Sequence, residues 1–133
     1  MPLVRISLLK GKPASYRRKV GDAVHQAMVE TINVPPDDRF QIVTEHDPED
    51  FVFDREFLGI RRSRDLVMVQ ITLSTGRSLA QKRALYRAIA SRLGGAAQLR
   101  SEDVLISLVE NTREDWSFGN GVASYAPQET VAA

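Results

Sequence analysis

The sequence predicts an α+β fold in which two β-α-β units form one four-stranded mixed sheet backed by two helices. Stretches of alternating apolar and polar residues are each followed by a stretch with helical spacing, and this order occurs twice, over about residues 2–46 and 66–110. The 133 residues are the size of one ordinary domain. We therefore expect a single domain over residues 1–133, with a C-terminal hairpin and tail over residues 111–133.

The first unit begins with an alternating strand over residues 2–9, which the Lys10–Pro13 segment ends. From Ser15 the apolar residues recur every three or four positions, as is typical of an amphipathic helix. The apolar stripe of this helix consists of Tyr16, Val20, Ala23, Val24, Ala27, Met28 and Ile32. The Val34–Pro36 segment should stop it, because proline lacks an amide donor and disfavours helical geometry in the preceding residue. A second strand is expected over Arg39–Thr44.

The second unit repeats this order. An alternating strand over Leu66–Ser74 is broken by Gly76, and Ser78–Gln81 resembles a capping box at the start of a helix. The apolar side of that helix consists of Leu85, Ala88, Ile89 and Leu93. We expect the helix to end at Gly94-Gly95 and a last strand to follow over Val104–Val109.

Equivalent positions in the two units are separated by a constant 65 residues. This offset joins Ile6 to Ile71, Gly11 to Gly76 and Asp38 to Asp103. Two such units side by side place both helices on one face of the sheet. The segment Phe51–Asp65 between the units is too polar to cover the whole opposite face, so we expect subunits to associate.

Composition and charge exclude several function classes. The 18 basic and 17 acidic side chains leave a net charge of +1, which argues against a nucleic-acid or membrane partner and favours a small-molecule one. With no cysteine and only the well-separated His25 and His46, no metal site is expected. The N-terminus has no apolar run of the length of a signal peptide, which indicates a cytoplasmic location.

Pro2 is the first candidate for chemistry. In the repeat it corresponds to Val67, so a proline begins the first strand where an ordinary strand residue begins its equivalent. Proline is also simply tolerated at the first residue of a strand. Once Met1 is removed, however, Pro2 presents a secondary amine, and an α-amino group titrates near about 8. An apolar pocket or a nearby cation would lower that pKa and make the amine a base at neutral pH.

Together with Pro2, four further motifs resemble the tautomerase superfamily, and most closely the malonate semialdehyde decarboxylase group. These motifs are Asp37–Val43, Ser74–Ser78, Val109–Asn111 and Asp115–Gly119. The resemblance covers about residues 2–120. It implies a trimer of β-α-β-β-α-β subunits whose sheets face a central barrel, with an amino-terminal proline at the base of each of three pockets. It also implies an enzyme that uses no cofactor.

The resemblance assigns roles to two charged residues. An acid at Asp38 would orient Pro2 or activate water, whereas turn capping is the ordinary role of an aspartate at such a position. The Arg77 guanidinium would hold a substrate carboxylate through two parallel hydrogen bonds. The decarboxylase has two arginines spaced Arg-x-Arg here, and this chain has Thr75 in the first position. That departure places tautomerisation ahead of decarboxylation, with Thr75 and Arg77 contacting substrate.

The resemblance also makes Trp116 and Phe118 an apolar wall that would keep Pro2 poorly solvated, although a lone tryptophan more often belongs to a core or an interface. The leading hypothesis is therefore a cofactor-independent tautomerase acting on a 2-oxo acid of the phenylenolpyruvate type, with Pro2 as general base and acid. The first alternative is a malonate semialdehyde decarboxylase. The other is a non-catalytic binding module on the same trimeric scaffold, since a fold does not determine a function.

Overall fold

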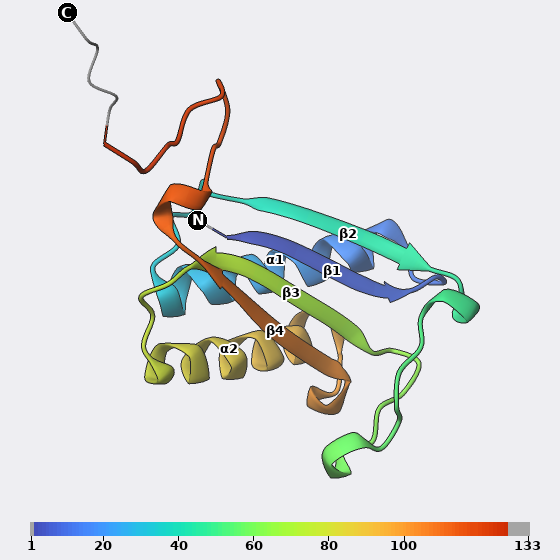
Figure 1. The fold of residues 1–133 in the computed structure, drawn as a ribbon. Coiled ribbons are helices and arrows are strands. Elements are labelled where there is room, and N and C mark those ends of the chain that lie inside the picture. The colour runs from blue at the N-terminus through green and yellow to red at the C-terminus, as the bar shows by residue number, and fades with distance from the viewer. Residues whose placement is uncertain (1, 128–133) are drawn as a thin grey trace, which may run out of the picture.

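The computed structural model describes residues 2–127 and confirms the predicted β-α-β-β-α-β order. Its strands and helices are β1 (Leu3–Leu9), α1 (Ala14–Ile32), β2 (Phe40–His46), β3 (Val67–Ser74), α2 (Leu79–Ala97) and β4 (Val104–Asn111). The four strands form one mixed sheet in the order β2-β1-β3-β4, with both helices on the same face (Figure 1). β1 is parallel to β2, β3 is parallel to β4, and β1 and β3 meet antiparallel at the centre.

The offset of 65 residues holds in the backbone as well. Both helices are 19 residues long and begin at equivalent positions. Gly11 and Gly76, which lie two residues after the first strand of each unit, have φ angles of 124° and 125°, a region that disfavours side chains. Asn33 and Gln98, the C-caps of the two helices, are both left-handed, with φ angles of 58° and 55°. The two units therefore share one backbone design and differ in their side chains.

The core lies between the sheet and the two helices. The strand residues that face the helices are buried, and the residues between them are less so. The buried strand residues are Val4, Ile6, Leu8, Val69, Ile71 and Leu73, and they pack against Val20, Val24, Met28, Leu85, Ile89 and Leu93 of the helices. Burying side chains of this size supplies most of the stability of such a domain.

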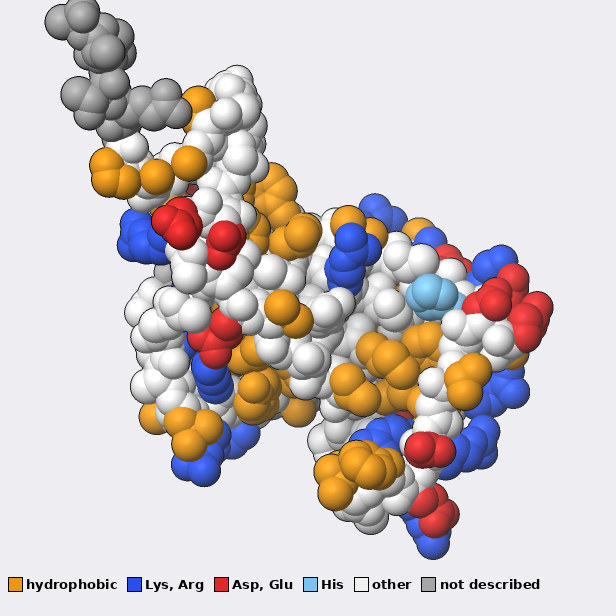
Figure 2. Space-filling model, in the orientation of Figure 1, with side chains coloured by type: hydrophobic (Ala, Val, Ile, Leu, Met, Phe, Trp, Pro, Cys, Tyr) orange, Lys and Arg blue, Asp and Glu red, His pale blue; other side chains and the backbone are white. Residues whose placement is uncertain are grey.

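The opposite face of the sheet is open in the single subunit. Apolar side chains at alternate positions of the two edge strands are exposed there: Phe40 and Ile42 of β2, and Leu105 and Val109 of β4. Figure 2, which views this side, shows apolar side chains at the surface. The segment Phe51–Asp65 projects beyond the end of the sheet (Figure 1). No helix among the described residues is long and apolar enough to cross a membrane.

Two local predictions were wrong. α2 does not end at Gly94-Gly95 but continues to Ala97, because the amide of Leu99 bonds the carbonyl of Leu93 3.2 Å away and buries the Leu99 side chain against the core. That packing offsets the helix propensity that glycine lacks, about 1 kcal/mol per residue. The predicted strands also begin or end up to two residues away from the observed bounds.

The predicted C-terminal hairpin has no strand within its described part. After Asn111 the chain makes a 3-10 turn over Arg113–Asp115 and then a loop that the Ser124 amide closes on the Trp116 carbonyl, 3.1 Å away. Asn120 and Gly121 have φ angles of 61° and 68°, and the Val122 amide lies 3.5 Å from the Gly119 carbonyl, so the loop contains a tight turn of the kind that joins hairpin strands. No strand flanks this turn in residues 112–127. Residues 128–133 of the predicted tail lie outside the described residues.

Candidate active site

The strand register gathers the predicted site residues at one end of the sheet. Leu3 pairs with Phe40 on one side and with Thr72 on the other, and Ser74 pairs with Asn111. The starts of β1 and β2 therefore lie beside the ends of β3 and β4 (Figure 1). This places Pro2, Asp38, the Thr75–Arg77 turn and the Trp116–Phe118 segment at the same end, although they come from four separate parts of the chain.

A cavity of about 340 Å³ opens at this end, between the start of α2, the end of α1 and the C-terminal loop. Of the predicted residues, Thr75 and Arg77 line it, whereas Pro2, Asp38, Trp116 and Phe118 are outside its lining in the single subunit. Arg77 and Arg113 are the charged residues of the lining, and neutral polar groups from Asn33, Ser74, Gln81 and Tyr125 accompany them. The cavity is therefore suited to an anion.

Arg77 is held by its own turn. Its Nη1 donates to the carbonyl of Ser74 over 3.0 Å, and the side chain is half-buried. The next residue, Ser78, caps α2 in the capping box that the sequence predicts, with Gln81 as its partner. A guanidinium and the first turn of a helix thus meet at the cavity wall, and both attract negative charge.

Pro2 is buried directly before β1, and Asp38 is half-buried two residues before β2, with its Oδ2 shielded from solvent. α1 fixes the segment that carries Asp38. The Nε2 atom of His25, which is only 3% exposed, lies 2.9 Å from the carbonyl oxygen of Pro36. On the other side of Asp38, Arg39 donates to Asp22 over 2.7 Å. The aspartate is therefore held between two contacts to one rigid helix.

The structure brings Trp116 and Phe118 together in an aromatic cluster. Their rings are stacked with centroids 5.3 Å apart, and the Trp116 indole donates to the Asn111 side chain over 2.8 Å. Phe118 also contacts Phe40 at 5.8 Å and Tyr125 at 5.5 Å. This cluster adjoins the start of β2, and in the single subunit Phe40 and Phe118 remain 50% and 40% exposed.

Sequence reasoning missed Arg113 and Tyr125, which both line the cavity. The Arg113 guanidinium lies 5.2 Å from the centre of the Tyr125 ring. Partial burial raises the pKa of Tyr125 and the Asp38 carboxylate adds to this, while Arg113 and Arg77 act in the opposite direction. The phenol therefore stays protonated at neutral pH, and its hydroxyl has a proton to donate to a ligand in the cavity. Neither residue belongs to a periodic stretch, so only the fold of the loop reveals them.

Comparisons with known proteins give matches over most of the chain. Two family models, both described as tautomerase enzyme, match residues 38–119 and residues 2–60. The probable tautomerase YusQ of Bacillus subtilis (strain 168) is 43% identical over 123 residues, which are 92% of this chain and 97% of YusQ. The probable tautomerase YrdN of the same organism is 38% identical over 94% of this chain and 96% of its own length.

Solved structures show the same fold. One is malonate semialdehyde decarboxylase in wild-type, mutant and inactivated forms, at 35% identity and a TM-score of 0.87 over 92% of this chain and 95% of that one. A second malonate semialdehyde decarboxylase, inhibited by 3-bromopropiolate, is 39% identical with the same TM-score over 92% and 93%. A fused 4-OT, described as a symmetric trimer, has a TM-score of 0.77 at 22% identity over 95% and 99%, which shows the fold alone.

Proposed function

This chain belongs to the tautomerase family of enzymes, and from that premise we propose that it tautomerises a 2-oxo acid of the phenylenolpyruvate type without a cofactor. The observation that carries the proposal is the arrangement at one end of the sheet. A buried proline at the start of β1 lies at the same end as a cavity whose charged lining residues are two arginines.

Pro2 is the proposed proton-transfer group. With Met1 removed, its nitrogen accepts the proton of the enol hydroxyl as the carbonyl forms, and the electron pair of the carbon–carbon double bond takes up a proton that Pro2 returns to the adjacent carbon. Burial of the amine favours its neutral form and so makes it a base near neutral pH.

The other site residues bind the substrate and prepare Pro2. Arg77 binds the carboxylate through its guanidinium, and Thr75 contacts the same group from the cavity wall. Asp38 orients Pro2 or activates water, and the stacked Trp116 and Phe118 exclude solvent from the amine. The open apolar face of the sheet, together with solved relatives described as trimers, supports a homotrimer in which this face is covered.

Malonate semialdehyde decarboxylase activity is the second candidate, and one observation favours it. Decarboxylation needs the leaving carboxylate held while the remaining carbonyl is polarised, and Thr75 removes one of the arginines expected for this. The structure places Arg113 in the same cavity as Arg77, so two guanidinium groups are still available. We find no observation that favours a non-catalytic binding module.

The test is ketonisation of phenylenolpyruvate, followed by ultraviolet absorbance, with malonate semialdehyde assayed in parallel. Mass spectrometry first establishes that Met1 is absent. Pro2→Ala should lower kcat/KM by about 10²–10⁴, the usual contribution of a positioned general base. Pro13→Ala, at the opposite end of β1, is the matched control and should retain activity. Equal turnover in wild type and Pro2→Ala would refute the role of Pro2, and turnover of malonate semialdehyde alone would establish the second candidate.

A further inference from the structure

The end of the sheet opposite the candidate active site has the same backbone design, because the two units are related by the 65-residue offset. At the active-site end the Thr75 amide bonds the Asn111 carbonyl over 2.8 Å. At the opposite end the equivalent Lys10 amide bonds the His46 carbonyl over 2.9 Å. An ion pair is repeated as well, between Lys82 and Glu110 in one unit and Arg17 and Glu45 in the other.

The aromatic pair is also repeated. Phe51 and Phe53 occupy the positions equivalent to Trp116 and Phe118, and their ring centroids are 5.7 Å apart. Phe51 is 7% exposed and stacks on His46 at 5.6 Å. The opposite end therefore has its own fixed apolar wall.

A second cavity, of about 280 Å³, opens beside this wall. Its lining combines apolar groups from Leu9, Pro48, Phe51 and Phe53 with two arginines, Arg55 and Arg64. No carboxylate belongs to this lining among residues 2–127. Of the acids near this cavity in sequence, Asp47 pairs with Lys10 and Asp65 with Lys12, each at 3.0 Å, and Glu56 lies 3.7 Å from Arg61. Three further acids of the same segment are outside the lining: Glu49, Asp50 and Asp54.

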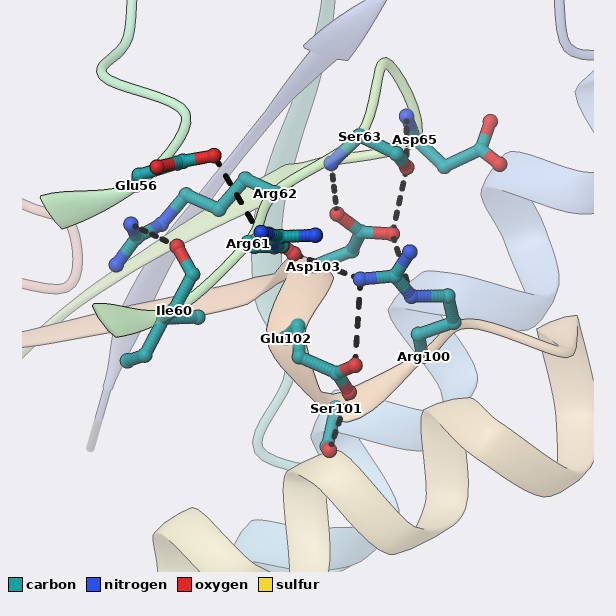
Figure 3. Close-up of polar contacts among 10 residues, drawn as sticks. All are labelled: Glu56, Ile60, Arg61, Arg62, Ser63, Asp65, Arg100, Ser101, Glu102 and Asp103. Atoms are coloured by element: carbon teal, nitrogen blue, oxygen red, sulfur yellow. Dashed lines mark hydrogen bonds and ion pairs between the residues drawn. The ribbon is translucent and has the colours of Figure 1, made fainter. Parts of the chain in front are cut away.

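Neither arginine of this cavity has a side-chain contact of the polar kind that stabilises the fold among the described residues. Within the described part of the chain, the guanidinium groups of Arg55 and Arg64 make no side-chain hydrogen bond and no ion pair. Arg64 belongs to the basic run over residues 61–64, and the other two arginines of that run are engaged. Arg62 donates to the carbonyl oxygens of Phe57 and Ile60, and Arg61 lies 3.7 Å from Glu56. Figure 3 shows the contacts to Ile60 and Glu56. Two cations beside an apolar wall, with no carboxylate in the described lining, favour an anionic ligand.

The backbone around Arg64 is rigidly held. Asp103 accepts hydrogen bonds from the amide of Ser63 at 2.6 Å and from its hydroxyl at 2.7 Å (Figure 3). The amide of Asp65 donates to the same hydroxyl over 3.1 Å. Arg64 therefore lies between two fixed residues, and its side chain starts from a defined point at the cavity.

The proton-transfer group is missing at this end. Val67 occupies the position equivalent to Pro2, is fully buried and pairs with Val104 inside the sheet. We propose that this second cavity is a non-catalytic binding site for a small carboxylate with an aromatic or apolar body. Arg55 and Arg64 hold the carboxylate, and Phe51, Phe53 and Leu9 contact the apolar part.

The experiment is a ¹H–¹⁵N NMR titration of the full chain with 3-phenylpropanoate, an unreactive probe of this class. Amides of residues 51–55 should shift with saturation in the wild type and equally in Arg77→Ala, which disables the catalytic cavity. In the double variant Arg55→Gln/Arg64→Gln the Kd from these amides should rise at least tenfold. The matched control Arg18→Gln/Arg87→Gln removes the same charge from exposed helix positions and should leave that Kd unchanged.

A measurement of tautomerase turnover distinguishes a failure of this binding-site proposal from a failure of the proposed function, on which it does not depend. The Arg55→Gln/Arg64→Gln variant should keep the tautomerase kcat/KM of the wild type within about twofold. The proposal is overturned if residues 51–55 show no saturable shift in the wild type, as would follow from a neighbouring copy filling the cavity. It is also overturned if the shifts persist in the double variant, or if that variant loses turnover. Failure of the wild type to turn over substrate would refute the proposed function and leave this result unaffected.

Discussion

Asp38 and Asp103 occupy equivalent positions in the two units, 65 residues apart, yet they lie at opposite ends of the sheet in different surroundings. Asp103 is fully buried and binds the Ser63 amide and hydroxyl, which ties the inserted segment to the start of β4. Asp38 is half-buried at the end where Arg77 and Arg113 line a cavity, and it acts electrostatically on Tyr125. The comparison shows that one backbone position anchors a loop in one unit and, in the other, lies at the end of the sheet where the arginine-lined cavity opens.

The largest effect should come from Asp103. Asp103→Ala removes two hydrogen bonds to a buried charged acceptor and leaves the Ser63 groups without it, so the free energy of unfolding should fall by about 2–4 kcal/mol. Chemical denaturation measures this loss. The activity per folded molecule should stay unchanged. A large loss of kcat in folded Asp103→Ala would show that the end of the sheet with Asp103 affects the candidate active site at the other end.

For Asp38 we expect the opposite result, a loss of activity with little change in stability. Asp38→Asn keeps the shape of the side chain and removes the charge, so kcat/KM for phenylenolpyruvate should fall about tenfold to a hundredfold if the carboxylate assists Pro2. The free energy of unfolding should change by less than about 1 kcal/mol, because the side chain is only partly buried. Steady-state kinetics and a denaturation curve on the same preparation test both parts. Unchanged kinetics would remove Asp38 from the mechanism.

The N-termini of the two helices also differ between the units, and a smaller loss of stability is expected from changing them. Ser78 begins α2 with a capping box, whereas its equivalent, Pro13, begins α1 with no side-chain cap. Ser78→Ala should cost about 1 kcal/mol of stability, and Pro13→Ala should cost less because no side-chain hydrogen bond is lost. Thermal unfolding of the two variants ranks them. Equal losses would indicate that the box adds nothing to α2.

The smallest effect concerns the titration of Tyr125. Its raised pKa means that the folded state disfavours the phenolate, so this residue removes stability only as the pH rises above the usual value of about 10 for tyrosine. Asp38→Asn should lower this pKa and Arg77→Ala should raise it. The difference in phenolate absorbance between each variant and its Tyr125→Phe counterpart isolates this tyrosine. If neither substitution changes the pKa of Tyr125, then neither Asp38 nor Arg77 acts electrostatically on this phenol.

The element order follows from the sequence because apolar periodicity indicates each strand and helix, and the 65-residue offset shows that the order is repeated. The helix end at Gly94-Gly95 was predicted wrongly, since burial of Leu99 against the core is a tertiary effect that outweighs glycine propensity. Arg113 and Tyr125 could not be predicted, because their place at the cavity depends on an irregular loop of non-periodic sequence. The roles of Pro2, Asp38, Arg77, Thr75, Trp116 and Phe118 remain predictions.

The antiparallel pairing of β1 with β3 has a consequence for how the chain assembles. Within each unit the paired strands begin 37 residues apart, at positions 3 and 40 and at positions 67 and 104. The two units meet through the β1–β3 pairing and the α1–α2 contact, and the chain that joins them runs outside both. Each unit therefore forms its parallel strand pair within its own stretch of chain, and the two units share one core. A long connection between them adds little to the entropy of loop closure. Proteolytic cleavage between residues 52 and 60 should therefore leave two fragments that remain associated and that recombine after denaturation.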